Sequence, residues 1–131
     1  MTGITVRPSG RSLGADIEGV DLSQPLDDAT FGQILDAWAE HLVLRFRGQK
    51  LTDDQLAEFS ARFGALDDAP IRAAGTPQHD RRRDIAVISN IVEGDKPLGS
   101  LGNSELVWHQ DMSYKDLPPK ASILYGVETP A

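Results

Sequence analysis

Two helical patterns with a short strand pattern between them constrain the fold of this chain most. Apolar residues recur at helical spacing after Asp27 and Asp28, either of which can serve as the N-cap of a helix. The apolar positions, which predict one buried helix face, are Phe31, Ile34, Leu35, Trp38 and Leu42. Directly afterwards the run LVLRF, residues 42–46, predicts a strand, and the pair Gly48 and Gln49 predicts a turn.

The second helical pattern begins with a capping box. Thr52 is followed three residues later by Gln55, and Leu51 and Leu56 occupy the two positions of a hydrophobic staple. A helix is therefore expected from this point, ending at Gly64 in a left-handed cap. Its apolar face consists of Leu56, Phe59 and Phe63.

Short strand patterns fill most of the remaining sequence. Strands are predicted in residues 4–6, 14–22, 84–92, 106–111 and 121–127, with long loops at residues 65–83 and 93–105. No repeat or linker divides the chain, so we expect a single domain over residues 1–131. Two helices beside a run of short strands indicate an α+β fold built on a sheet or half-barrel.

Composition excludes several classes of function. The 131 residues include no cysteine, which rules out disulfides, thiolate metal sites and a cysteine nucleophile. A net charge of −7 argues against nucleic acid and anionic membranes as partners. The chain shows no pattern of a signal peptide or membrane span, so a cytoplasmic location is expected.

The stretch WHQDMSY, residues 108–114, contains a candidate metal site. On a strand, His109 and Asp111 would lie on one face, roughly 6.6 Å apart at Cα, while Gln110 points the other way. Imidazole and carboxylate suit a divalent cation, and two histidines with one carboxylate hold the metal of non-haem Fe(II) oxygenases. The triplet alone is also compatible with an incidental arrangement, because short motifs have many false positives.

Three ordered segments resemble the N-terminal part of the taurine and 2,4-dichlorophenoxyacetate dioxygenases. They are LGADIEGVDL, HLVLRFRGQKLTDDQLAEFSARFGAL and WHQDMSYKDLPPKASILYGVETP. The resemblance covers nearly the whole chain, and its most specific parts are the FRGQ turn into a helix and the W-H-x-D motif followed by P-P and L-Y.

This resemblance implies the N-terminal portion of a double-stranded β-helix, the jelly-roll fold of cupins, with two flanking helices. It implies an Fe(II)- and 2-oxoglutarate-dependent dioxygenase that uses O2, hydroxylates a small anionic substrate and releases succinate and CO2. His109 and Asp111 correspond to two of the three metal ligands. Asn103 and Glu105 lie where relatives place substrate contacts, although solvated loop residues fit this position as well.

Other residues have simpler interpretations. His41 is expected to interact with a helix terminus, and His79 to be an exposed loop residue or to line the pocket. Trp108 is expected in the core and Tyr114 as an aromatic wall beneath the site. Arg45 and Arg47 are expected to form a buried structural ion pair or a solvated edge, and residues 80–84 are expected to form a solvated turn.

The family's Gly-Gly-Asp-Thr segment, distal histidine and arginine have no counterpart in this sequence. We therefore expect a truncated domain, inactive alone, whose third ligand and 2-oxoglutarate contacts lie beyond Ala131. When full length, the protein is expected to form a homo-oligomer. The alternative function is that of a non-catalytic binding or oligomerisation module.

Overall fold

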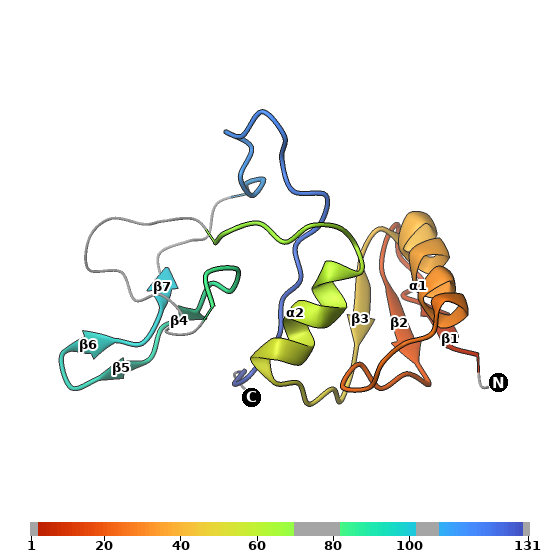
Figure 1. Ribbon diagram of the computed structural model, residues 1–131, viewed down its shortest axis with the longest axis horizontal. Coiled ribbons are helices and arrows are strands. Elements are labelled where there is room, and N and C mark those ends of the chain that lie inside the picture. The colour runs from red at the N-terminus through yellow and green to blue at the C-terminus, as the bar shows by residue number, and fades with distance from the viewer. Residues whose placement is uncertain (1–2, 70–81, 102–107, 130–131) are drawn as a thin grey trace. The chain divides into compact units, whose positions relative to one another are not determined.

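A three-stranded sheet organises the N-terminal part of the molecule (Figure 1). The computed structural model describes residues 3–69, 82–101 and 108–129. It divides into two compact units, residues 1–56 and residues 57–131, which are described separately below.

The sheet of the first unit has the strand order β1-β2-β3. β1 (Thr5–Pro8) runs antiparallel to β2 (Ala15–Glu18), and β2 runs parallel to β3 (Leu44–Phe46). Because parallel neighbours need a crossover connection, helix α1 (Asp28–His41) lies between β2 and β3 along the chain, as in a βαβ unit. The strands predicted in residues 4–6, 14–22 and 42–46 are thus confirmed; the first extends to Pro8, and the other two are shorter than their patterns.

Helix α1 begins as the sequence predicts. The side chain of Asp27 accepts a hydrogen bond of 2.6 Å from the backbone N–H of Thr30, which caps the first turn. The helix ends one residue before its apolar pattern does, because Leu42 adopts a positive φ of 66° and is 63 % exposed. The expectation that Leu42 continues the buried face is therefore wrong. Trp38 is only half-buried, and its indole Nε1 donates to the Leu42 carbonyl at 3.0 Å.

The two faces of the sheet differ in polarity. Ala15 and Ile17 of β2 are buried, whereas Asp16 points to the opposite face. There Asp16 accepts two hydrogen bonds from Arg45, at 2.5 and 3.0 Å, and one from Arg47 at 3.5 Å. Both arginines therefore belong to a structural ion pair, as one of the two expectations has it, but their side chains are exposed and not buried. The buried side chains of this unit are Ala15, Ile17, Leu22, Phe31, Ile34 and Ala37.

Helix α2 (Asp53–Ala61) starts at the predicted capping box. The backbone N–H of Thr52 donates to the Gln55 side chain at 2.8 Å, and the Gln55 N–H donates to the Thr52 hydroxyl at 3.2 Å. Beyond the boundary at residue 57, Phe59 is buried and its ring meets that of Phe63 edge to face, with centroids 5.4 Å apart. Gly64 follows with a positive φ of 151°, which favours the glycine found there.

The second unit contains two pairs of two-residue strands. β4 (Ile88–Ser89) runs parallel to β7 (Ser100–Leu101), and β5 (Val92–Glu93) runs antiparallel to β6 (Lys96–Pro97). The single strand predicted over residues 84–92 is wrong.

A side-chain hydrogen bond explains the interruption of that strand. The Ser89 hydroxyl accepts the N–H of Ile91 at 3.0 Å and so withdraws this group from a ladder. Part of the predicted loop at residues 93–105 instead supplies β6 and β7.

Residues 108–129 form no strand, which corrects the expectation of strands at 121–127 and at the described end of 106–111. The chain turns after Asp111, with Met112 at φ 50° and the Lys115 N–H bonded to the Met112 carbonyl at 3.1 Å. A strand is stabilised by its ladder, and within the described ranges no neighbour pairs with this segment. None of the described helices is long and apolar enough to span a membrane.

Candidate metal centre

His109 and Asp111 face one another in the second unit. The His109 Nε2 lies 3.3 Å from the Asp111 Oδ1. The sequence predicts this proximity through alternation on a strand, but in the structure a turn that begins at Asp111 brings the two groups together.

The distance between these two atoms suits a shared cation. Two ligands at right angles around an octahedral ion, each with a bond of about 2.1 Å, lie roughly 3.0 Å apart. The observed 3.3 Å is close to this value, and both side chains are about 60 % exposed, so an ion can reach them. A neutral imidazole and a carboxylate are suitable donors for such an ion.

The second carboxylate oxygen of Asp111 also has a partner. The Ser122 hydroxyl donates a hydrogen bond of 3.2 Å to the Asp111 Oδ2. Sequence reasoning missed Ser122, because an exposed serine eleven residues after the carboxylate belongs to no spaced motif. The described residues contain no group of three or more His, Cys, Asp or Glu side chains that could hold a metal.

The other predicted site residues lie elsewhere or cannot be placed. Asn103, Glu105 and His79 are outside the described residues. His41 is the last residue of α1, where its side chain is largely buried, which confirms the helix-terminal interpretation. Residues 82–84 of the charged run include a bidentate ion pair from Arg82 to Asp84 at 2.9 and 2.6 Å, so this part is not simply a solvated turn.

The two aromatic residues near the site are both exposed. Trp108 is 100 % exposed, so the expectation of a core residue is wrong. Tyr114 is 73 % exposed and forms no wall under the site within the described segments. The cause is the same for both: among the residues that the structure describes, no strand pairs with this segment to provide a sheet against which the aromatic rings could pack.

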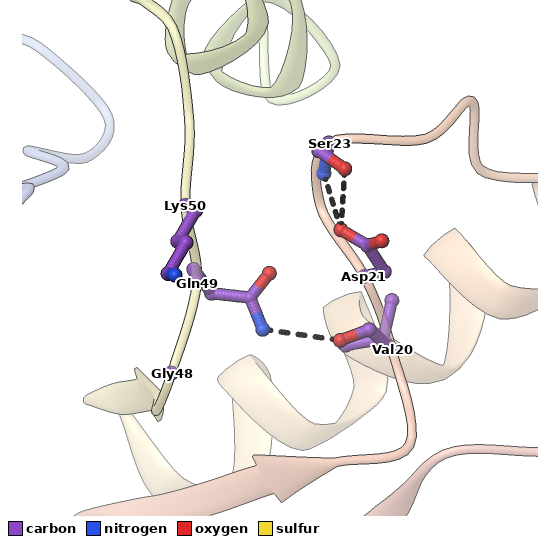
Figure 2. A pocket seen from close by; sticks show the side chains of 6 residues that line it. All are labelled: Val20, Asp21, Ser23, Gly48, Gln49 and Lys50. Atoms are coloured by element: carbon purple, nitrogen blue, oxygen red, sulfur yellow. Dashed lines mark hydrogen bonds between the residues drawn. The ribbon is translucent and has the colours of Figure 1, made fainter.

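The first unit contains a polar hollow of about 310 Å³ (Figure 2), lined by Val20, Asp21, Ser23, Gly48, Gln49 and Lys50. The Gln49 side chain accepts the N–H of Leu22 at 2.8 Å and donates to the Val20 carbonyl at 3.1 Å. Asp21 accepts hydrogen bonds from the Ser23 hydroxyl and N–H, which lower the pKa of its carboxyl. Most of these polar groups are held in hydrogen bonds within the hollow. We therefore interpret the hollow as a turn stabilised by its own side chains and not as a catalytic site.

Comparison with known proteins identifies one family. Residues 5–131 match the family described as "Taurine catabolism dioxygenase TauD, TfdA family". The chain is 34 % identical over 126 residues to pentalenolactone F synthase of Streptomyces avermitilis, an alignment that covers 95 % of this chain and 40 % of that protein. It is 37 % identical over 128 residues to an alpha-ketoglutarate-dependent sulfate ester dioxygenase of Pseudomonas putida, covering 98 % and 38 %.

A solved structure also resembles the chain. It is a Burkholderia xenovorans protein assigned provisionally as an alpha-ketoglutarate-dependent taurine dioxygenase, with 36 % identity and a TM-score of 0.53. The match covers 63 % of this chain and 28 % of that one. The chain thus spans about two fifths of the length of the two curated relatives, at 40 % and 38 %.

Proposed function

The chain belongs to the TauD/TfdA dioxygenase family, and from this membership we propose that it is the metal-binding N-terminal part of an Fe(II)- and 2-oxoglutarate-dependent dioxygenase. The proposed fold is the corresponding portion of a double-stranded β-helix. When bound, the metal and 2-oxoglutarate supply an oxidation in which O2 adds one oxygen atom to a substrate C–H bond and one to the succinate released with CO2.

The observation that carries this proposal is the facing pair of donor atoms in WHQD. His109 Nε2 and Asp111 Oδ1, at 3.3 Å, have the separation expected of adjacent ligands on one divalent ion. One imidazole and one carboxylate are two members of the two-histidine, one-carboxylate set that holds Fe(II) in oxygenases. The roles of these two residues are to bind the ion and to leave its remaining positions open.

We propose that the third metal ligand and the 2-oxoglutarate contacts come from a region of the protein that corresponds to the remaining three fifths of the relatives' length. Two relatives act, by name, on a sulfate ester and on 2,4-dichlorophenoxyacetate. A small anionic organic molecule is therefore the proposed substrate class, with Asn103 and Glu105 as candidate contacts. A single incomplete domain, a homo-oligomer at full length and a cytoplasmic location stay predictions.

Metal binding tests the site in the chain as it exists. Mn(II) is a paramagnetic divalent ion with ligand preferences similar to those of Fe(II). It is titrated into the protein, and the signal of free Mn(II) is followed by electron paramagnetic resonance. We expect weak binding that a chelator removes, because two protein ligands hold the ion. His109→Ala and Asp111→Ala should each weaken binding at least about tenfold, whereas Gln110→Ala should bind like the unchanged chain.

In a form extended to the length of the relatives, both ligand variants should also lose succinate formation from 2-oxoglutarate. Equal losses for Gln110→Ala and His109→Ala would indicate structural damage. Unchanged Mn(II) binding in both ligand variants would refute the site and leave the alternative of a non-catalytic module.

A further inference from the structure

We infer that Ser122 is a positioning residue for the Asp111 carboxylate, an inference that rests on the proposed metal site. The Ser122 hydroxyl donates to Asp111 Oδ2 at 3.2 Å, while Oδ1 of the same carboxylate faces His109 Nε2 at 3.3 Å. The two oxygens of Asp111 therefore have different partners.

This difference matters because the carboxylate can rotate. The terminal torsion of an aspartate is broad, so the plane of a carboxylate without a fixed partner can turn over a wide range. The hydrogen bond from Ser122 to one oxygen restricts this rotation and keeps the other oxygen directed toward the position where His109 can share an ion. Hydrogen bonds from outside the ligand set commonly orient metal-binding carboxylates in this way.

The position of Ser122 makes a packing role a poor explanation for this residue. Ser122 is exposed, as are its neighbour Ala121 and Asp111 itself. Removal of one hydroxyl at such a position leaves no cavity and no buried unpaired group. Ser122→Ala should therefore leave the fold intact and act on the metal site alone.

Pro118 and Pro119 separate Ser122 from the turn that holds the ligand pair. A proline ring fixes φ, and the residue before a proline is restricted as well. The arm that carries the serine is consequently stiffer than an ordinary exposed loop of this length. Less conformational freedom is then lost when the hydroxyl is held against Asp111.

The test compares the Mn(II) affinity of four chains by electron paramagnetic resonance. Ser122→Ala should bind about tenfold more weakly, and Ser122→Thr, which retains a hydroxyl, should bind within roughly twofold of the unchanged chain. Ser113→Ala is the matched control, because Ser113 is also exposed and lies two residues from Asp111. It should bind Mn(II) as the unchanged chain does, and far-ultraviolet circular dichroism should be the same for all four.

The possible failures differ in meaning. If Asp111→Ala weakens Mn(II) binding and Ser122→Ala does not, the inference about Ser122 is overturned while the metal site stands. A weakened Ser122→Thr, or a changed circular dichroism spectrum of Ser122→Ala, would overturn it too, since the serine would then act through its shape or through the fold. If Asp111→Ala itself binds Mn(II) normally, the proposed site fails and the role of Ser122 fails with it.

Discussion

The side chain of Gln49 accepts a hydrogen bond of 2.8 Å from the backbone N–H of Leu22, a residue 27 positions earlier. The same amide donates to the Val20 carbonyl at 3.1 Å. One side chain after β3 thereby satisfies two backbone groups in the segment that follows β2. Gln55 forms a similar hydrogen bond to the same segment: its Nε2 donates to the Ser23 carbonyl at 3.0 Å.

Gln49→Ala should destabilise the chain by about 1–3 kcal/mol, because the partly buried N–H of Leu22 loses its partner. Urea unfolding followed by circular dichroism measures the change. Lys50→Ala, at the exposed neighbouring position, should alter stability by less than about 0.5 kcal/mol. Identical unfolding midpoints for the two variants would contradict this role of Gln49.

Thr52→Ala should cost about 1 kcal/mol, because the Gln55 N–H in the first turn of α2 loses its acceptor. Thr52→Ser keeps the hydroxyl and should retain most of this stability. The melting temperatures of both variants, measured by circular dichroism, separate loss of the hydroxyl from loss of the methyl group. A serine variant as unstable as the alanine variant would argue against the capping box.

Gly99→Ala should destabilise the second unit by roughly 1–3 kcal/mol, since overpacking moves the backbone. A Cβ at this buried glycine would lie 2.7 Å from the backbone N of Ser89 and 3.0 Å from the Val87 carbonyl oxygen, so β4 and β7 would separate. Gly32→Ala provides a control of opposite sign. Gly32 lies in α1 with open space around it, and alanine there should stabilise the helix by up to about 1 kcal/mol. Calorimetry measures the stability of both variants. A Gly99→Ala variant as stable as the unchanged chain would refute the close approach of Gly99 to Ser89 and Val87.

Asp67 should keep its negative charge at a lower pH than an ordinary aspartate. The Lys115 ammonium donates to Asp67 Oδ2 at 2.5 Å, and this hydrogen bond, aided by the positive charge, lowers the pKa of the Asp67 carboxyl. Because the pKa is lower in the folded chain, the stabilisation is present above the unfolded value of about 3.9 and is lost as the pH falls through the folded value.

Carboxyl titration by nuclear magnetic resonance measures this shift. Lys115→Met should raise the pKa of Asp67 toward the ordinary value, whereas Lys96→Met should leave it unchanged. An Asp67 that titrates identically in the unchanged chain and in Lys115→Met would disprove the pairing.

The chain should self-associate as its concentration rises. Leu117, Leu124 and Val127 are 86 %, 83 % and 87 % exposed, and exposed apolar groups of this kind promote association. Sedimentation velocity should detect species heavier than the monomer, and the double variant Leu117→Ser, Leu124→Ser should reduce them. A monomer with a sharp, cooperative melt at every concentration would count against this prediction.

The sequence predicts best those features that depend on nearby residues. The Asp27 cap and the Thr52–Gln55 capping box each join groups three residues apart, so the residues themselves specify the contact. The partner of a strand cannot be predicted from nearby residues in the sequence. Alternation alone does not reveal that the Ser89 hydroxyl interrupts a strand, or that residues 121–127 have no neighbour within the described ranges.

The candidate site likewise has one part that the sequence predicts and one part that it does not. The spacing of His109 and Asp111 is a local signal and can be read from the motif. The contact of Ser122 with Asp111 depends on the path of the chain through a turn and two prolines, and no local pattern specifies that path.

The βαβ arrangement of β2, α1 and β3 has a consequence for synthesis on the ribosome. Phe46, which pairs with Ile17, is the last residue of the β2–β3 ladder to be synthesised. About 65 further residues separate Phe46 from Asp111, and translation at roughly 5–20 residues per second needs about 3–13 s to add them. All residues of the parallel ladder have therefore been synthesised several seconds before Asp111 is added to the nascent chain.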